Sequence, residues 1–462
     1  MHTVKPINIR ETVGLKDGED SAIKEKHLVI TVVEELKKKA IELNFDFCTY
    51  NGQSYFYNGN YWTLVGSEEL KQLLRNFAYM LGIDKYTSKH YNFAENLLKQ
   101  YLVSTIIEKK QDDGITKINL QNGTFEFSNN PQLTSFNKSD FIRYQLPFNY
   151  DSNEKAPLFE AYLNKVLPDL DCQNILAEYI GYVFTKGHKQ EKCMLLYGGG
   201  ANGKSVFFNI ISALLGKENI TNCTLRELGN PNSRALINNK LLNYSSEIDA
   251  SINKDTFKQL VSGEPLQAKA LYKDVYIIDN YAKLIFNCNE LPKDVEYTEG
   301  FFRRWLIIPF TQTILACEQD KNLASKIIQV ELSGVFNWVL LGLQRLIEQG
   351  QFTQSNMIDN CLNDFKQETD SVYQFVSHCN YKPSKTHKKG MLELYKTYTT
   401  FCNENGFKSP NIENFGKRLV IHGFTIKRER HGNFVWLEEA GNSTRNKENY
   451  LFSDDDLDEL PF

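Results

Sequence analysis

The chain has 462 residues, of which 41% are hydrophobic, 13% aromatic and 24% charged, with a net charge of −4. This composition provides packed cores for about three domains and excludes an intrinsically disordered chain. The nine cysteines form no CxxC pair, which argues against a zinc ribbon and fits a reducing compartment. Because the sequence has neither a signal peptide nor an apolar stretch of membrane-spanning length, we expect a cytoplasmic protein.

The first 150 residues predict a short leader and a small α+β domain. Residues 1–25 are polar, and we expect a flexible leader there. Residues 26–150 contain helix-forming stretches and two hairpins. The helices are expected at 27–43, 67–81 and 88–107, and the hairpins turn at Asn58-Gly59 and Asn122-Gly123. The domain has no catalytic constellation, so we interpret it as a scaffold or assembly domain.

Residues 151–352 predict an α/β domain with a buried parallel sheet. After a helical stretch over 155–190, short runs that are apolar throughout alternate with helical segments, which is typical of strands covered on both faces. These runs are CMLLY, KLLNYSSE, AKLIFNCN and RRWLIIPF. A long amphipathic helix is predicted over 325–348, followed by a polar linker over 353–380.

A glycine-rich loop lies between the first of these strands and the helix KSVFFNIISALLG. It matches GxxxxGK[ST] in the strand–loop–helix context that a phosphate-binding loop requires, although a chance glycine-rich turn is the alternative. Its backbone N–H groups and the helix N-terminus can hold phosphate oxygens. Lys204 is expected to reach the β- and γ-phosphates of ATP, and Ser205 to ligate Mg²⁺. The loop consists of Gly198, Gly199, Gly200, Ala201, Asn202, Gly203, Lys204 and Ser205.

Two further strand ends carry polar groups suited to ATP hydrolysis. LLNYSSEID ends in Glu247, which can orient and deprotonate a water with help from the metal, and Asp249 is a second acid nearby. AKLIFNCNELP ends in Asn289, which we prefer as a contact to the γ-phosphate because the apolar run has ended there; Asn287 is the alternative. An ordinary exposed carboxylate and an asparagine that only serves a turn would look the same in sequence.

Arg303 and Arg304 stand just before the fourth strand, in FFRRWLIIPF. In ring ATPases, an arginine of one subunit stabilises the transition state on its neighbour's nucleotide. A surface pair engaged in salt bridges is the simpler interpretation of two arginines alone. Because they follow the loop, the acid and the amide in this order, we assign the role of arginine finger to Arg304, with Arg303 as the alternative.

In this order, GGGANGKS, NYSSEID, SGEPLQAKALYKD, FNCNELP and FFRRWLIIPF resemble the superfamily 3 helicase domain of phage and plasmid primase-helicases, to which poxvirus-type primase-helicases are more distantly related. The resemblance extends over about residues 30–438. It implies an AAA+-like motor that uses ATP and Mg²⁺, forms a hexamer on single-stranded or forked DNA, and moves 3′ to 5′. It also implies replication of a phage, plasmid or mobile element in a bacterial host cell.

The resemblance further implies that SGEPLQAKALYKD is a DNA-contacting hairpin, with Lys269 and Lys273 at its basic positions. A ring of lysines binds successive phosphates without reading sequence. The chain departs from the family pattern in two ways. Ser246 precedes Glu247 where many relatives have a pair of acids, and the chain begins almost at the pre-motor domain, so we expect any primase to be a separate protein.

Residues 381–438 predict a small DNA-binding domain. Residues 381–437 contain eleven Lys or Arg and four acids, an asymmetry typical of nucleic-acid binding. The pattern helix, turn, helix, hairpin resembles a winged helix, and one that binds protein is the alternative. The expected DNA contacts are Lys417 and Arg418 on the second helix and Lys427, Arg428 and Arg430 on the wing.

Residues 439–462 predict an acidic, disordered tail that ends in Leu460-Pro461-Phe462. This ending is similar to the acidic tip of bacterial single-stranded-DNA-binding proteins, which implies recruitment of host replication proteins. A tail that only improves solubility is the alternative. The acids before the final residues are Asp454, Asp455, Asp456, Asp458 and Glu459.

These inferences give an α/β fold class: an AAA+-like P-loop motor core with an α+β N-terminal domain and a C-terminal winged helix. The predicted function is an ATP-dependent DNA helicase. Two other functions stay open. One is an initiator that uses ATP to assemble at an origin and unwinds little; the other is a P-loop ATPase that acts on a protein or a small molecule. The basic segments argue against the second.

Overall fold

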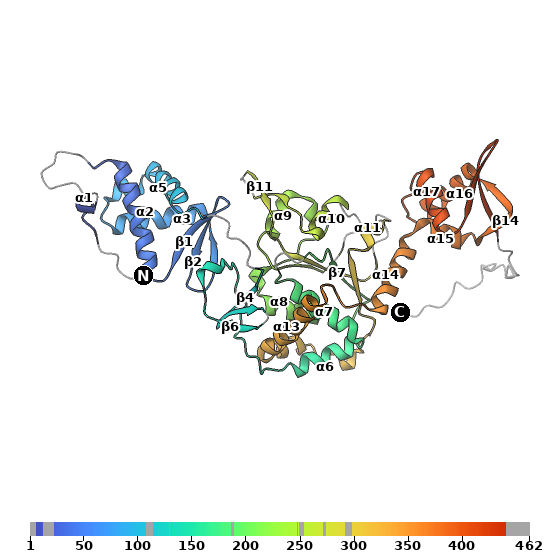
Figure 1. Cartoon of the computed structure of the whole chain (residues 1–462), viewed down its shortest axis with the longest axis horizontal. Helices are drawn as coiled ribbons and strands as arrows, with labels where there is room; N and C mark the ends of the chain where they lie inside the picture. The colour runs from blue at the N-terminus through green and yellow to red at the C-terminus, as the bar shows by residue number, and fades with distance from the viewer. Residues whose placement is uncertain are drawn as a thin grey trace, which may run out of the picture. The chain divides into compact units, whose positions relative to one another are not determined.

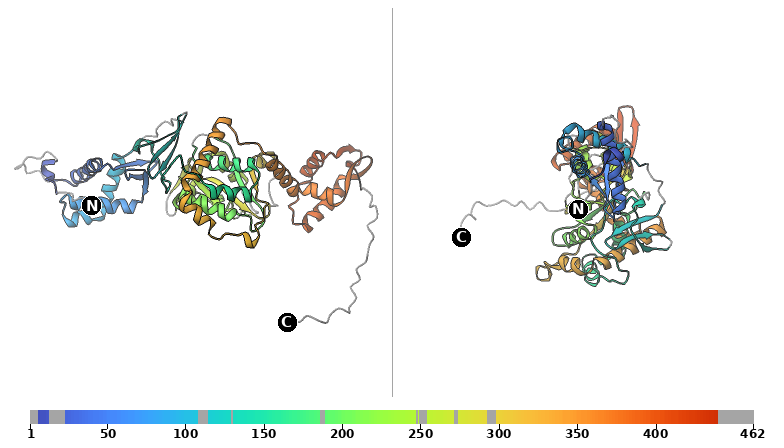
Figure 2. Two further views of the ribbon diagram at one scale, coloured as in Figure 1. Left: turned by 90° about the horizontal axis from the view of Figure 1, so that it is seen from below. Right: turned by 90° about the vertical axis from the view of Figure 1, so that its left-hand side faces the viewer.

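The chain divides into two compact units. The first comprises Met1–Leu291 with Glu299–Leu362, and the second Pro292–Thr298 with Asn363–Phe462. The predicted N-terminal domain and motor therefore belong to one unit. The computed structural model (Figures 1 and 2) describes residues 6–12, 23–107, 114–128, 130–185, 189–246, 248, 254–270, 274–291 and 298–439.

The N-terminal part of the first unit combines helices with two small antiparallel sheets, ordered β1-β2-β3 and β4-β5-β6. The helices are α1 (Ile9–Thr12), α2 (Glu25–Glu42), α3 (Ser67–Met80), α4 (Lys85–Lys89) and α5 (Tyr91–Ser104). The strands are β1 (Asp46–Tyr50), β2 (Gln53–Tyr57), β3 (Trp62–Val65), β4 (Thr116–Leu120), β5 (Gly123–Phe127) and β6 (Gln132–Thr134). The predicted helices and both predicted hairpins are present, but the second hairpin turns at Gln121-Asn122 rather than at Asn122-Gly123, because Leu120 pairs with Gly123.

Two other features of this part differ from the prediction. Strand β1 is absent from the predicted elements, yet Asn51 and Gly52 after it have φ of 50° and 71°, as a two-residue hairpin turn requires. Part of the predicted flexible leader is also ordered, since the N–H of Ile7 donates to the carbonyl of Leu81 at 3.2 Å. Residues 1–5 and 13–22 of that leader lie outside the described residues.

A five-stranded sheet, ordered β13-β7-β12-β9-β8, lies at the centre of the remaining part of the unit (Figure 1). All its strand pairs are parallel. The strands are β7 (Cys193–Tyr197), β8 (Ile220–Thr221), β9 (Leu242–Ser245), β12 (Lys283–Cys288) and β13 (Trp305–Pro309). The four apolar runs predicted as strands are β7, β9, β12 and β13, and nearly all their residues are buried. The α/β class with a parallel sheet is therefore confirmed.

Helices cover both faces of this sheet, with α7, α8 and α13 on one side and α9 and α10 on the other (Figure 1). The helices are α6 (Pro157–Val166), α7 (Leu170–Tyr182), α8 (Lys204–Leu215), α9 (Pro231–Ile237), α10 (Lys254–Ser262), α11 (Glu299–Phe302), α12 (Leu323–Val330) and α13 (Leu332–Gln349). A small hairpin of β10 (Leu266–Lys269) and β11 (Val275–Ile278) lies outside the parallel sheet.

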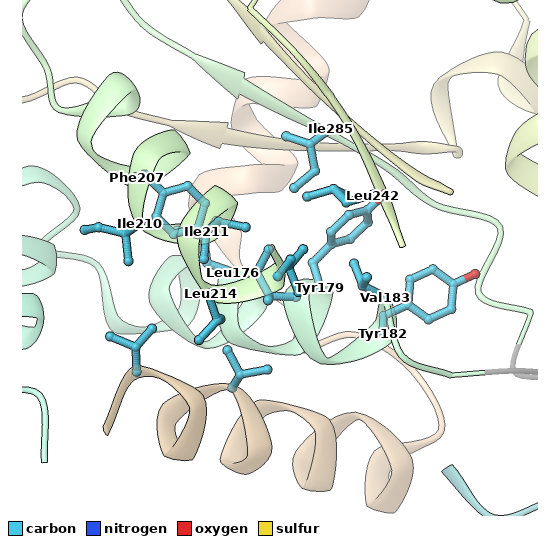
Figure 3. Packing of buried hydrophobic residues seen from close by; sticks show 14 of the residues in the cluster. Leu176, Tyr179, Tyr182, Val183, Phe207, Ile210, Ile211, Leu214, Leu242 and Ile285 are labelled. Atoms are coloured by element: carbon cyan, nitrogen blue, oxygen red, sulfur yellow. The ribbon is translucent and has the colours of Figure 1, made fainter. Parts of the chain in front are cut away.

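The largest core lies between the sheet and the layer that contains α7 and α8. Figure 3 shows Tyr179 of α7 and Ile211 of α8 close to Leu242 and Ile285 of the strands, and all four are fully buried. Helix α13 packs closely on α7, since a Cβ at Gly342 would lie 2.3 Å from the backbone of Ala177. Helix α6 contacts the start of α8, where the phosphate-binding loop was predicted, since the Tyr162 hydroxyl donates to the carbonyl of Gly203 at 2.9 Å.

The helix predicted over 325–348 is interrupted, because Glu331 separates α12 from α13. The buried carboxylate of Glu331 accepts the N–H groups of Leu158 and Phe159, each at 2.9 Å, and so satisfies the first turn of α6. Among the described helices, no single one is long and apolar enough to cross a membrane. Two helical segments, Ala316–Val330 and Leu332–Gln349, are long and apolar enough only when they are taken together, and the chain bends by 81° between them.

Among its described residues, the second unit contains helices α15, α16 and α17 and the end of α14, together with a three-stranded antiparallel sheet ordered β14-β16-β15. The elements are α15 (Ser371–His378), β14 (Tyr381–Gly390), α16 (Met391–Glu404), α17 (Ile412–Ile421), β15 (Thr425–Glu429) and β16 (Gly432–Glu439). Helices α16 and α17 and the hairpin β15–β16 agree with the prediction. The segment predicted as a linker is helical instead, with α14 (Asn356–Thr369) followed by α15. Strand β14 has a lysine-rich sequence with a proline, which edge strands tolerate.

Asp370 holds the second unit together at the start of α15. It is fully buried, accepts the N–H of Val372 at 2.9 Å, and lies 2.7 Å from Nε2 of His422 and 3.5 Å from the guanidinium of Arg418. Burial by itself would raise the pKa of Asp370, but the hydrogen bond with His422 and the charge of Arg418 outweigh it, so the pKa lies below its usual value.

We expect Asp370→Asn to destabilise the second unit by about 1.5–3 kcal/mol at neutral pH, because asparagine keeps the helix cap but loses the charge. A carboxylate with a lowered pKa stabilises the fold above its unfolded pKa of about 3.9, and this stabilisation is lost as the pH falls through the folded pKa. The difference in denaturant stability between wild type and variant should therefore shrink below about pH 4.

Glu413→Gln is the matched control, since Glu413 pairs at 2.7 Å with Lys417 on the exposed surface of α17 and should contribute little. Equal stability of Asp370→Asn and wild type at neutral pH would contradict the assignment.

Candidate nucleotide site

The loop between β7 and α8 occupies the carboxyl end of the parallel sheet, the edge at which ligands bind in open α/β folds. Gly198 has φ of 154°, and a Cβ there would lie 2.2 Å from the carbonyl oxygen of Phe310. Gly203 has φ of 89°, and a Cβ there would lie 2.7 Å from Val166. Gly199 and Gly200, by contrast, face open space. The backbone is thus fixed at both ends and accessible between them, as a phosphate cradle requires.

Lys204 lies at the first position of α8 and is only 7% exposed. Its ammonium group donates to the carbonyl oxygens of Gly198, at 2.5 Å, and Gly199, at 3.0 Å, and to Oδ1 of Asn202, at 2.9 Å. Burial lowers the pKa of Lys204. The next residue, Ser205, is exposed on the first turn of the same helix. The contacts of these two side chains to phosphate and to Mg²⁺ stay predictions.

Asn202 links the loop to strand β13, a role that the sequence pattern does not reveal. Its Nδ2 donates to the carbonyl of Phe310 at 2.9 Å, while its Oδ1 accepts from Lys204. Two backbone bonds support the same connection: the N–H of Phe310 donates to Tyr197 at 2.7 Å, and that of Ile314 to Ala201 at 2.8 Å. The loop and the exit of β13 therefore form one hydrogen-bonded structure.

We expect Asn202→Ala to lower the free energy of unfolding of the first unit by about 1–3 kcal/mol, because the substitution removes a buried donor and an acceptor for a charged group. Denaturant unfolding measures this loss. Asn209→Ala is the matched control, since Asn209 lies exposed on α8. If both variants have wild-type stability, Asn202 does not link the loop to β13.

The predicted acids lie outside what the structure describes, since Glu247 and Asp249 are not among the described residues. The strand that leads to them is confirmed, and Tyr244 within it donates from its hydroxyl to Oδ1 of Asn287 at 3.2 Å. Asn287 is 9% exposed in β12. Asn289 is exposed just beyond β12, directly after Cys288, whose carbonyl accepts the N–H of Gly198 at 3.1 Å. Asn289 thus lies beside the loop, whereas Asn287 is engaged by Tyr244.

The two arginines differ in exposure. The Arg304 side chain is 10% exposed and donates to the Gly300 carbonyl and, at 3.1 Å, to Oγ of Ser262. The Arg303 side chain is 60% exposed and lies 3.4 Å from the carboxylate of Glu191. Both precede β13, where the N–H of Cys193 donates to the carbonyl of Arg304 at 2.7 Å. The pair therefore lies at the amino end of β7, at the opposite edge of the sheet from the loop.

The hairpin β10–β11 contains one of its two predicted lysines among the described residues. Lys269 is exposed at the end of β10, opposite Val275, whereas Lys273 lies outside the described residues. The exposed fractions of Val275, 54%, and Ile277, 57%, show that one face of the hairpin is open to solvent. Lys269 lies on this open face.

The predicted DNA contacts of the second unit fall into two groups. Lys417, Lys427, Arg428 and Arg430 are exposed. Arg418 is directed toward Asp370 and is 19% exposed, which gives it a structural contact rather than an open surface. The acidic residues of the tail, Asp454 to Glu459, and the terminal Leu460-Pro461-Phe462 lie outside the described residues.

Three family models match successive parts of the chain. They are "D5 N terminal like" at residues 33–168, "Family of unknown function (DUF5906)" at 196–304, and "Poxvirus D5 protein-like" at 367–458. The second covers the loop, Asn289 and both arginines. The solved structures of the NrS-1 C-terminal region overlap 88% of this chain and 98% of theirs at 12–14% identity, but TM-scores of 0.47 and 0.49 are too low to support a conclusion.

Viral proteins named as putative helicases are similar in sequence. Putative helicase 121R of Invertebrate iridescent virus 3 is 22% identical over 75% of this chain and 40% of its own length. Putative helicase L207/L206 of Acanthamoeba polyphaga mimivirus is 26% identical over 35% of this chain and 18% of its own length. The chain thus matches less than half the length of these relatives. Together with the two D5-type matches, they support a primase-helicase-type protein, as the motifs predict.

Proposed function

We propose that this chain is an ATP-dependent DNA helicase of the superfamily 3 type, with an AAA+-like motor that acts as a ring. The observation that carries the proposal is the separation of Lys204 and Arg303 at opposite ends of β7. The strand has five residues and spans roughly 16 Å, so Arg303 cannot reach the loop of its own chain. A head-to-tail neighbour can bring an arginine to that loop, and a closed ring repeats the contact at every interface.

The site supports a role for each residue at the loop. Lys204 would stabilise the γ-phosphate, and Ser205 would hold Mg²⁺, which neutralises phosphate charge when bound. Glu247, with Asp249 as a second acid, would activate water, and Asn289 would contact the γ-phosphate. Asn289 stays our preference over Asn287, because it is exposed beside the loop.

The exposure of the arginines changes our preference for the finger. Arg304 is buried and bonded within its own chain, whereas Arg303 is exposed and, among the described residues, its side chain forms an exposed ion pair with Glu191, which is weak. We therefore propose Arg303 as the finger and Arg304 as the residue that fixes the loop before β13.

DNA would contact both units. Lys269, with Lys273, would bind phosphates in the ring channel. The second unit would act as a winged helix, with Lys417 on α17 and Lys427, Arg428 and Arg430 on the hairpin near the backbone. Arg418 is not included, because it holds Asp370.

Several parts of the proposal rest on the resemblance alone. They are a hexameric ring, 3′ to 5′ movement, a phage or other mobile element as source, a bacterial host cell, and host replication proteins as partners of the tail. An origin-binding initiator is the second candidate function, which the exposed basic hairpin of the second unit favours.

The test is the steady-state rate of ATP hydrolysis with and without single-stranded DNA, together with unwinding of forks that carry either a 3′ or a 5′ tail. Hydrolysis stimulated by DNA, with unwinding from the 3′ tail, supports the helicase. Hydrolysis and sequence-specific footprints without unwinding would favour the initiator. Hydrolysis indifferent to DNA would overturn both.

A further inference from the structure

The outer face of the sheet in the second unit carries two aromatic rings that its core does not use. Along β16, Val435 and Leu437 are buried in the core, whereas Phe434 and Trp436 point to the opposite face and are half-buried. The exposed face of an antiparallel sheet is ordinarily polar. Two adjacent rings on it therefore indicate a surface with a specific use.

Cations lie over both rings. The ammonium of Lys388 is 4.7 Å from the centre of the Phe434 ring, and that of Lys427 is 5.4 Å from the centre of the Trp436 ring. Beside Phe434 the neighbouring strand contributes Gly390, and a Cβ there would meet no heavy atom within 4 Å. The sheet face is thus open beside Phe434, and a lysine ammonium lies over each of the two rings.

We propose that this face binds single-stranded DNA by stacking bases on Phe434 and Trp436. A flat ring with a cation beside it matches a nucleotide, whose base can replace the ammonium over the ring while the ammonium moves to the phosphate. Duplex DNA does not fit, because its base faces are already stacked inside the helix. This proposal deepens the proposed function. It rests on that function in one respect, the choice of DNA as the ligand.

Acidic neighbours limit the electrostatic part of this binding. Glu429 accepts from Lys388 at 2.5 and 2.6 Å, and Glu438 accepts from Ser384 at 2.9 Å. Lys388 must leave Glu429 to contact a phosphate. Stacking on the rings therefore provides most of the affinity of this face, and base-free DNA should bind it poorly.

The test uses the full chain without nucleotide and compares two labelled strands of about 16 nucleotides, oligothymidine and an abasic strand with the same phosphates. Wild type should prefer oligothymidine. Phe434→Leu and Trp436→Leu should each weaken oligothymidine binding about ten-fold and leave abasic binding unchanged, since ten-fold corresponds to about 1.4 kcal/mol, which lies within the range for stacking one base. Leu392→Ala, which shortens an apolar side chain 67% exposed on α16, is the matched control.

Equal affinity of wild type for the two strands would overturn the proposal. The proposal would also be overturned if Phe434→Leu and Trp436→Leu lost the same affinity for the abasic strand, or for duplex DNA, as for oligothymidine. Failure of the proposed helicase function can be told apart from failure of base stacking, because the first appears as an absence of ATP hydrolysis and the second in the DNA-binding measurement. Lys204→Ala should keep the preference for oligothymidine, since Lys204 lies in the other unit.

Discussion

Lys204→Ala is expected to lower DNA-stimulated ATP hydrolysis by about 10²–10³-fold and to abolish fork unwinding, because it removes a positioned charge from the transferring phosphate. The ammonium is buried at the start of α8 and ringed by the oxygens of Gly198, Gly199 and Asn202. These oxygens engage all three N–H groups of the ammonium, so contact with a phosphate exchanges one of these bonds for the phosphate oxygen.

Lys217→Ala is the matched control, since Lys217 is an exposed lysine just beyond the other end of α8. Circular dichroism and size-exclusion elution should be unchanged in both variants. Hydrolysis by Lys204→Ala at the wild-type rate would show that the measured ATPase does not use this loop, and the helicase proposal would then lose its catalytic site.

The loop is predictable from sequence because its signal is local. Four of its eight positions are specified by a pattern set by backbone geometry and phosphate contact, and the flanking strand and helix are continuous in the chain. The parallel strands are predictable for a similar reason: a strand covered on both faces must be apolar throughout, as β7 and β13 are.

Contacts between distant segments were beyond the reach of sequence patterns. Nothing in the spacing indicates that Asn202 donates to Phe310, that Tyr244 engages Asn287, or that Arg418 holds Asp370. These contacts depend on strand order and register, which a single sequence does not specify. The interruption at Glu331 has the same origin, because that carboxylate is required by a helix more than 160 residues earlier in the chain.

The choice between the two arginines shows the same limit. Arg303 and Arg304 are equivalent in sequence and both lie near Glu191, at 3.4 and 3.5 Å, so only the fold separates the buried side chain bonded to Ser262 from the exposed one. Glu191 itself has φ of 51°, uncommon for a residue other than glycine, and no sequence pattern marks it. Exposure therefore decides which arginine a neighbouring subunit can meet.

Arg303→Ala is expected to lower the hydrolysis rate by about 10³–10⁵-fold, the range measured for an arginine finger, with nucleotide binding preserved. Arg304→Ala should instead lower the melting temperature, because it leaves Ser262 and the Gly300 carbonyl without their donor. The decisive measurement mixes two inactive variants, Arg303→Ala and Lys204→Ala, and follows ATP hydrolysis after subunit exchange.

In a mixed ring, an Arg303→Ala subunit supplies an intact Lys204, and a neighbouring Lys204→Ala subunit supplies an intact Arg303. Each interface of this kind contains both groups, so hydrolysis should reappear in proportion to the number of such interfaces. If Arg303 acted within its own chain, no site in the mixture would contain both groups, and the rate would stay at the level of the separate variants. Glu191→Gln should leave the recovery intact, since an exposed ion pair at 3.4 Å is too weak to withhold the arginine from a phosphate.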